Sequence, residues 1–478
     1  MNELKNKNEK VDNSFDQSIN EHADQLIPVS ENKSLCAVPW THTFISPQSE
    51  RRMCCASREK SSYIQQYIDQ PGESGIAYQP KTLEEHWNSE YMRNIRLKML
   101  KGEKLSQCEV CNDQILNLST YKDWFNKALF PDLLNELHKN TDKNGFTNMR
   151  PISYDYRVHN TCNFKCRMCG EQLSSAWEQE KRTYNEWSEK FDPWMIPEIK
   201  VKINDFQKNV VETELVKAIE DKIIREIYWV GGEPLVWDLH WNLMKRMIEL
   251  GFSDKVFCRY NTNLSHIEFK GMSLEKDLLP HFKGYLICAS IDGVGAIGEW
   301  IRTGLNWERF LTNFKKIQLG PGGKDSIALD VTLTLPGLFS MKKMFDLALE
   351  LDSQIITKII FAFDPQIVLS PMALPREILN EILDDLIKYV EPKVTQKTQS
   401  LLDTFYELKK RPTFAEAYPE NYREAFFRGR YYQLKVSERR QDGESGKPPC
   451  LGAIYKENEK VFNWWNQTRE EKFGKNEK

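Results

Sequence analysis

Three closely spaced cysteines are the residues of this sequence best placed to carry out chemistry. Cys162, Cys166 and Cys169 have the spacing C-x3-C-x2-C and follow a predicted strand over Ser153–Val158. Thiolates bind iron strongly, and a cubane iron–sulfur cluster has four corners, so three cysteines leave one iron open. A zinc knuckle with His159 as fourth ligand is the alternative. We favour iron, because the three cysteines already define the loop.

A Gly-Gly-Glu-Pro turn follows the next predicted strand, Glu226–Val230. Its glycines, Gly231 and Gly232, let the backbone approach a ligand closely, and the carboxylate of Glu233 suits an ammonium group. The turn alone is a weak signal, since an ordinary β-turn has the same composition. Together with the cysteine loop one strand earlier, it predicts a ligand site.

These two motifs resemble those of the radical S-adenosylmethionine (SAM) superfamily, and the resemblance covers residues 152–371. It implies a [4Fe-4S] cluster on Cys162, Cys166 and Cys169 whose open iron chelates SAM. Reduction then cleaves the sulfonium, and the resulting 5'-deoxyadenosyl radical abstracts a substrate hydrogen. The residue before the third cysteine is usually aromatic in this family, whereas here it is Met168, which can still pack against the adenine.

The resemblance also implies which side chains hold SAM. Arg302 and Ser290 would bind its carboxylate and Asn263 would lie on the ribose side, while Phe164 and Asp292 complete the predicted site. An arginine suits a carboxylate because its guanidinium donates two bonds. Each of these polar residues could instead be a helix cap, a turn residue or a surface ion pair. The electron would come from a donor such as flavodoxin or ferredoxin.

A second group of cysteines precedes the three-cysteine loop in the chain, in the segments Cys36–His42, Met53–Cys55 and Cys108–Cys111. These segments resemble the auxiliary-cluster modules called SPASM and Twitch, although in most relatives this module follows the radical SAM barrel. The resemblance implies a second, auxiliary [4Fe-4S] cluster. The ligands would be Cys36, Cys54, Cys108 and Cys111. A structural zinc site would use identical ligand types, so only the resemblance favours iron. Cys55 and Cys450 are reserve ligands.

The spacing of apolar runs predicts the elements that position these residues. Strand-like runs recur with helical segments between them, which is typical of βα units and a parallel sheet. The predicted strands are Ser153–Val158, Glu226–Val230, Lys255–Asn261, Tyr285–Ile291, Ile327–Leu335 and Lys358–Phe363, and the helices include Leu83–Lys101, Trp237–Leu250, Trp307–Ile317, Met341–Leu351, Arg376–Val390 and Thr398–Lys410. Cys258 and Cys288 fall inside strands, where we expect buried thiols.

The predicted fold class is α/β: a partial (β/α)6 TIM-like barrel with a small N-terminal cysteine-rich module and a C-terminal helical extension. The expected boundaries are a disordered tail over 1–33, the SPASM/Twitch-like module over 34–113, a helical connector over 114–150, the radical SAM barrel over 151–371, and the helical extension over 372–478. An insertion over Leu173–Lys222 is expected to cover the barrel mouth.

Composition limits the alternatives. The net charge of -3 gives no electrostatic reason to expect nucleic acid or an acidic membrane as partner. No apolar run reaches the roughly 18 residues of a membrane span, so we expect a cytoplasmic enzyme. The alternative function is a non-catalytic iron–sulfur or zinc-binding scaffold. A peptide, a sugar or another small metabolite would be the substrate, and the candidate contacts are Tyr156, His159, Trp177, Trp194 and Asp330.

Overall fold

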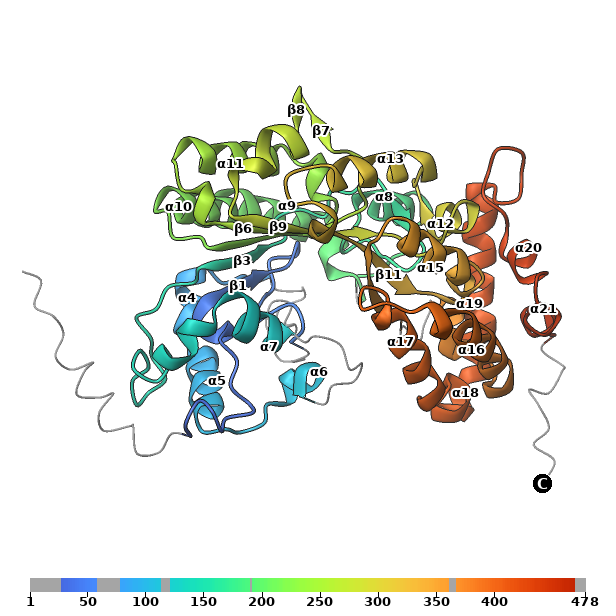
Figure 1. The fold of residues 1–478 in the computed structure, drawn as a ribbon, viewed down its shortest axis with the longest axis horizontal. Coiled ribbons are helices and arrows are strands. Elements are labelled where there is room, and N and C mark those ends of the chain that lie inside the picture. The colour runs from blue at the N-terminus through green and yellow to red at the C-terminus, as the bar shows by residue number, and fades with distance from the viewer. Residues whose placement is uncertain (1–26, 58–77, 113–120, 190, 361–366, 469–478) are drawn as a thin grey trace, which may run out of the picture. The chain divides into compact units, whose positions relative to one another are not determined.

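The computed structural model describes residues 27–57, 78–112, 121–189, 191–360 and 367–468 (Figure 1). The chain divides into two compact units. The N-terminal unit comprises Met1–Tyr156 and Val201–Ala218, and the C-terminal unit comprises Arg157–Lys200 and Ile219–Lys478. The expected start of the barrel at residue 151 therefore differs from this division, which falls at Tyr156.

Three of the described strands belong to the N-terminal unit. They are β1 (His42–Ile45), β2 (Arg51–Arg52) and β3 (Ser153–Tyr156), in the order β3-β1-β2. β1 runs parallel to β3, with His42 opposite Ser153, and antiparallel to β2. The helices of this part of the chain are α2 (Val38–Thr41), α4 (Leu83–Trp87), α5 (Glu90–Leu100), α6 (Glu109–Asn112) and α7 (Tyr121–Asp123), and α9 (Pro197–Phe206) and α10 (Glu212–Glu220) cross the division between the units.

The predicted single helix over Leu83–Lys101 is wrong, because the segment forms two helices. α4 ends at Trp87, and the side chain of Ser89 caps the start of α5 by accepting a bond from the Met92 amide. Serine at this position favours a helix start over helix continuation, since its oxygen satisfies an amide that would otherwise lack a partner.

Two other N-terminal predictions need correction. Residues 27–33 were expected to belong to a disordered tail, but Asn32 is buried and donates to the carbonyls of Met99 and Leu100, at the end of α5. Over the described residues 121–150, the expected helical connector contains only short pieces: α7, a π-helix over Trp124–Leu129 and a 3-10 helix over Pro131–Glu136. Its apolar side chains pack into the core of the cysteine-rich module, so it is part of that core. Residues 1–26 and 113–120 lie outside the described ranges.

Five of the described parallel strands belong to the C-terminal unit, and each lies beside the next of the five along the chain. They are β5 (Glu226–Trp229), β6 (Phe257–Thr262), β9 (Gly284–Ser290), β11 (Ile327–Leu333) and β12 (Gln354–Ile359). The last strand begins four residues earlier than the predicted Lys358–Phe363, because the alternation of Ile355, Thr357 and Ile359 already buries one face; residues 361–363 lie outside the described ranges.

Helices fill the connections between these strands. Figure 1 shows α11 (Asp238–Glu249), α13 (Trp307–Gln318) and α15 (Met341–Glu350) in sequence along one side of the strands. All three agree with the predicted helices to within a residue at each end. Shorter elements are α8 (Ser175–Thr183), α12 (Ala296–Ile301), α14 (Leu335–Leu338), the two-stranded pair β4 (Lys165–Cys166) and β10 (Arg302–Thr303), and the hairpin β7 (Glu268–Phe269) with β8 (Met272–Ser273).

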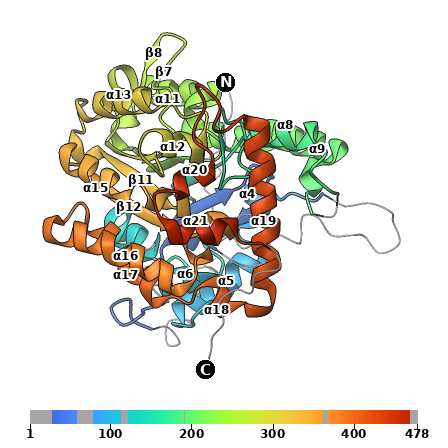
Figure 2. The same ribbon diagram turned by 90° about the vertical axis from the view of Figure 1, so that its right-hand side faces the viewer.

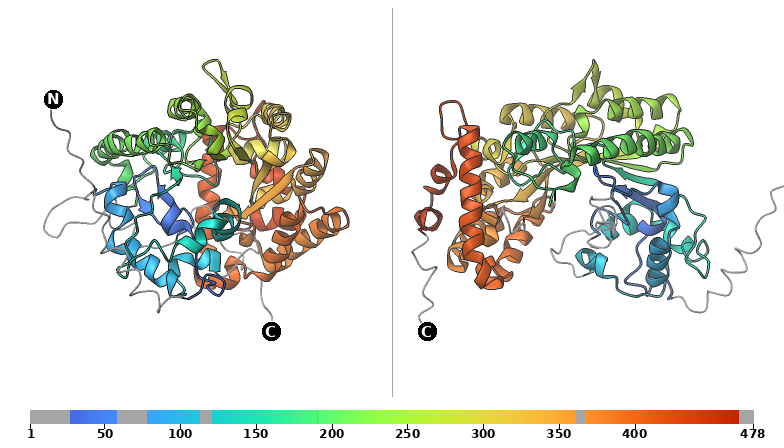
Figure 3. Two further views of the ribbon diagram at one scale, coloured as in Figure 1. Left: turned by 60° about the vertical axis from the view of Figure 1, so that its left-hand side comes forward. Right: turned by 180° about the vertical axis from the view of Figure 1, so that it is seen from behind.

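The C-terminal extension is helical, as predicted. It contains α16 (Arg376–Val390), α17 (Gln399–Lys410), α18 (Phe414–Ala417), α19 (Pro419–Arg440), α20 (Leu451–Tyr455) and α21 (Glu459–Asn466). Figure 2 shows α20 and α21 beside the long helix α19, which Figure 3 presents from behind. The indole of Trp464 donates to the Tyr422 hydroxyl and so joins α21 to α19. Of the helices that the structure describes, none combines the length and the apolar character needed to cross a membrane.

Candidate functional site

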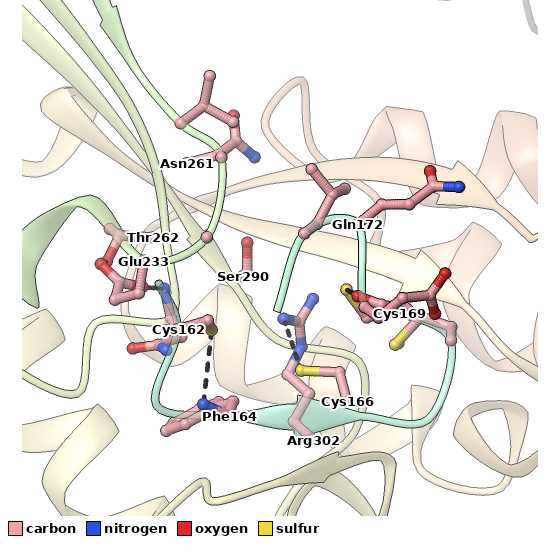
Figure 4. A pocket seen from close by; sticks show the side chains of 18 of the residues that line it. Cys162, Phe164, Cys166, Cys169, Gln172, Glu233, Asn261, Thr262, Ser290 and Arg302 are labelled. Carbon is pink, nitrogen blue, oxygen red and sulfur yellow. Dashed lines mark hydrogen bonds between the residues drawn. The ribbon is translucent and has the colours of Figure 1, made fainter. Parts of the chain in front are cut away.

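A cavity of about 650 Å³ lies at the carboxyl ends of β5, β6 and β9 in the C-terminal unit (Figure 4). In sheets of parallel strands, ligands bind at this edge. The cavity brings together most of the predicted site: it is lined by Cys162, Phe164, Cys166, Cys169, Gly231, Gly232, Glu233, Asn263, Ser290 and Arg302. Asp292 is the one predicted ligand-binding residue that does not line it; its carboxylate is completely buried and pairs with Arg302.

The three thiols line the cavity from one loop. In Figure 4, Cys166 and Cys169 lie on one side, and Cys162 lies on the other side with Glu233. Burial raises the pKa of all three thiols, and that of Cys169 reaches about 12. Each thiol would therefore be protonated without a bound cation, whereas a metal stabilises the thiolate. Three thiols without a fourth cysteine at the same cavity fit a cluster with one open iron.

Glu233 binds to the protein rather than projecting freely into the cavity. Its carboxylate accepts bonds from the Leu235 amide (3.0 Å), the Thr262 hydroxyl (2.7 Å) and the Asn263 amide (2.6 Å). Burial raises its pKa to about 7 despite these bonds. The side chain thus caps the short helix after the Gly-Gly-Glu-Pro turn and fixes the end of β6. We had expected this carboxylate to receive an ammonium group directly; the structure gives it a positioning role as well.

The two glycines are required by the approach of one backbone to another. A Cβ atom on Gly232 would lie 2.1 Å from the Thr161 carbonyl oxygen, and Gly231 has a φ of +134°. The Gly232 amide donates to the His159 carbonyl at 3.3 Å, and the Glu233 amide donates to the Thr161 carbonyl at 2.8 Å. The turn after β5 is therefore bonded to the segment that leads into the cysteine loop.

Arg302 is already engaged by a protein carboxylate. Its guanidinium pairs with Asp292 at 2.6 Å, and Asp292 also accepts from the Thr332 amide at 2.7 Å. A second guanidinium nitrogen lies 3.8 Å from the Cys166 sulfur. Asp292 raises the pKa of Arg302 against the opposing effect of burial, so the guanidinium stays charged. It places a permanent positive charge beside the second cysteine.

Asn263 connects β6 to the cysteine loop. Its amide nitrogen donates to the Asn163 side chain at 2.9 Å, and its oxygen accepts from the Ser265 amide at 3.0 Å. Ser290, at the end of β9, lines the cavity half-buried. Phe164 is buried, and its ring lies over Gly304, where a Cβ atom would be 2.8 Å from the ring.

Sequence reasoning named Asp330 but missed the polar side chains that join it to the cavity across one face of the sheet. Asn261 accepts a bond from the Tyr228 hydroxyl and donates to Asp330, each at 2.5 Å, and Asp330 pairs with Lys358 at 2.7 Å. These residues come from β5, β6, β11 and β12. The signal was the alternation of polar and apolar residues within each strand, since side chains two apart share a face.

The other candidate residues have different outcomes. Trp177 and Trp194 are buried, and the indole of Trp177 donates to the Cys166 carbonyl at 2.7 Å. Tyr156 belongs to the N-terminal unit, where its hydroxyl donates to Glu214 at 2.9 Å. The ring of His159 packs edge-on against Trp237 at 5.7 Å. Cys258 and Cys288 are buried within strands, which confirms that prediction.

The four N-terminal cysteines assemble in the N-terminal unit. Cys36, Cys54, Cys108 and Cys111 line one narrow cavity. Burial, together with the charges of Cys108 and Cys111, raises the pKa of Cys36 to about 12. Burial and the neighbouring cysteines raise the pKa of Cys54 in the same way.

The reserve ligands do not share this cavity. Cys55 is next to Cys54 in the chain but does not line the cavity, and Cys450 belongs to the C-terminal unit, beside Gly443. Within the described residues, no three His, Cys, Asp or Glu side chains are placed to hold a single metal ion. The four predicted cysteine ligands of the auxiliary site therefore line one cavity, but their thiols are not arranged around a common metal position.

Comparison with known protein families identifies the N-terminal module. Residues 36–112 match the SPASM iron-sulfur cluster-binding domain. This match includes all four cysteines assigned to the auxiliary site and supports an iron–sulfur cluster there over zinc. A search of the curated proteins found no match.

Proposed function

We propose that the chain is a radical SAM enzyme with an auxiliary iron–sulfur cluster. The observation that carries this proposal is the convergence of three thiols, the Gly-Gly-Glu turn and the ends of β6 and β9 on one cavity of about 650 Å³. The SPASM match supports it, because such domains occur in radical SAM enzymes. We also propose that the C-terminal unit is a partial barrel, since its five parallel strands are neighbours in chain order, as in singly wound barrels.

In this proposal, Cys162, Cys166 and Cys169 hold the first cluster. When bound, that cluster would supply the electron for reductive cleavage of SAM to methionine and a 5'-deoxyadenosyl radical, which would abstract a hydrogen atom from the substrate. The protein binds SAM, orients it and excludes water. Cys36, Cys54, Cys108 and Cys111 hold the auxiliary cluster, and a donor such as flavodoxin or ferredoxin supplies the electron.

Individual side chains would orient SAM as follows. Ser290 donates to its carboxylate, and Arg302 adds positive charge while Asp292 holds the guanidinium in place. Glu233 fixes the Thr262–Asn263 segment, and its carboxylate oxygens suit the SAM ammonium group. Asn261 lies between this cavity and Asp330, so the inner face of the sheet is the proposed position of a polar substrate.

Equilibrium binding of SAM to anaerobically reconstituted protein tests the proposal. We expect saturable binding of one SAM per chain, which fails when Cys162, Cys166 and Cys169 are all replaced by Ala. A non-catalytic scaffold would instead retain its metal and show no saturable SAM binding. The variant with Cys258→Ala is the matched control, because this buried thiol lies within β6 and does not line the cavity.

A further inference from the structure

The C-terminal helix α19 and Asp442, two residues beyond its end, contact the cysteine loop. Arg167, between the second and third cysteines, has a fully buried side chain. Its guanidinium donates to Gln433 (3.4 Å) and Ser437 (3.2 Å) of α19 and pairs with Asp442, just beyond the helix. A charged group that is out of water needs such partners for most of its donors.

Asp442 joins this contact to the neighbouring helix α12. It accepts a bond from the Trp300 indole at 2.8 Å, and the Arg167 guanidinium lies 4.2 Å from the centre of the Trp300 ring. The backbone amide of Arg167 donates to the Ile301 carbonyl at 2.7 Å. The loop is therefore held by its backbone and by its side chain.

A second arginine binds Lys165, the residue before the second cysteine. Arg440, the last residue of α19, donates to the Lys165 carbonyl and to the Thr303 hydroxyl, each at 2.9 Å. It also pairs with Glu180 at 3.2 Å and lies 4.4 Å from the ring of Trp177. Since the indole of Trp177 donates to the Cys166 carbonyl, the carbonyls of two consecutive loop residues are both occupied.

We propose that Arg167 and Arg440 are positioning residues for the cluster loop, and that the C-terminal extension is required to keep Cys166 and Cys169 in place. This inference rests on one part of the proposed function, which is that the cysteine loop binds a cluster. Loss of the Arg167–Asp442 pair is expected to loosen Cys166 and Cys169, which flank Arg167, and to leave the four N-terminal cysteines unaffected. The effect would thus be confined to one of the two clusters.

The test uses a variant that removes both charges of the pair. Arg167→Met with Asp442→Asn leaves no unpaired buried charge, which preserves folding better than removing one partner, and the asparagine keeps an acceptor for the Trp300 indole. Arg439→Gln is the matched control. Arg439 lies on the same turn of α19 but pairs with Glu186 and packs over Tyr184 rather than bonding to the loop.

The readouts are iron release to a chelator, the electron paramagnetic resonance spectrum of the reduced protein, and hydrogen exchange of residues 165–169. We expect the double variant to release about half of its iron at least tenfold faster than wild type, with an altered signal for that cluster and faster exchange in the loop. The Arg439→Gln variant should match wild type. A folded double variant with wild-type iron release and spectrum would overturn the proposal.

If the double variant does not fold, Arg440→Lys gives the same test. Lysine keeps the positive charge, but its single nitrogen cannot replace both guanidinium nitrogens, one of which donates to Lys165 and Thr303 while the other pairs with Glu180. Faster iron release is again expected, and wild-type release would overturn the proposal. Failure of the proposed function is distinguishable. If the Cys162, Cys166 and Cys169 triple variant holds as much iron as wild type, the loop binds no cluster at all.

Discussion

The charged residues that line the cavity contact one another, which fixes their positions for a ligand. Asp292 orients Arg302, and three donors from the chain surround Glu233. Such networks lower the cost of binding, because the side chains have already lost their freedom of movement. The consequence is that removing one member disturbs its partners as well as the ligand.

Replacement of Glu233 by Ala tests whether loss of one side chain disturbs its hydrogen-bond partners as well as the ligand. The change leaves the Leu235 amide, the Thr262 hydroxyl and the Asn263 amide without their acceptor, and each unsatisfied buried group costs about 1–3 kcal/mol. We expect the free energy of unfolding to fall by about 3 kcal/mol, measured by urea denaturation, and SAM affinity to fall about tenfold, since the donors include the end of β6.

Glu220→Ala is the control, because the Glu220 carboxylate is exposed and pairs with Arg246 on the surface. That variant should keep its stability within about 0.5 kcal/mol of wild type. A Glu233→Ala protein as stable as this control would show that the three hydrogen bonds do not hold the site together.

At the scale of elements, the turn after β5 and the segment before the cysteine loop pack backbone against backbone. Gly232→Ala would place a methyl group 2.1 Å from the Thr161 carbonyl oxygen, so one of the two segments must move. We expect a loss of about 1–3 kcal/mol in stability and weaker SAM binding, measured by thermal unfolding and equilibrium binding.

Gly170→Ala is the matched control for this change. Gly170 directly follows the third cysteine, and a Cβ atom there would meet nothing within 4 Å. The Gly170→Ala variant tests whether any methyl group added near the cysteines lowers stability and SAM binding as Gly232→Ala does. Equal losses in both variants would mean that the close contact at Thr161 is unimportant.

Sequence reasoning predicted most of the elements of the C-terminal unit. The starts of α11, α13, α15 and α16 fall within one residue of prediction, because their apolar periodicity is long and regular. The break between α4 and α5 was missed, since Ser89 acts through a cap that apolar periodicity does not reveal.

The candidate site was predictable where it depends on motifs that are local in the chain. The cysteine loop and the Gly-Gly-Glu turn line one cavity, as expected. The contacts of Asn261 with Asp330 and of Arg167 with Asp442 join residues 69 and 275 positions apart, so they depend on the tertiary fold. Short motifs carry no information about such pairs.

At the scale of the whole molecule, the predicted ligands of the two clusters belong to different units of the chain. We therefore expect Cys108→Ala with Cys111→Ala to lower the iron content from about eight to about four atoms per chain, as two cubanes predict. Dithionite-driven formation of 5'-deoxyadenosine should stay near wild type, while turnover of the substrate is lost. Iron analysis and chromatography of the products measure both.

The Cys55→Ala variant is the control for that experiment, because Cys55 is next to a predicted ligand but does not line the cavity of the four thiols. It should keep about eight iron atoms per chain. Loss of 5'-deoxyadenosine in the Cys108 and Cys111 variant would contradict the independence of the two clusters.

The central claim is that the cavity of the C-terminal unit cleaves SAM at a cluster held by Cys162, Cys166 and Cys169. The most direct measurement is the amount of 5'-deoxyadenosine formed when reconstituted protein is incubated anaerobically with SAM and dithionite. The account predicts formation by wild type and by Cys258→Ala, and none above the enzyme-free rate by the triple Cys→Ala variant. Equal 5'-deoxyadenosine from the triple variant and from wild type would contradict it.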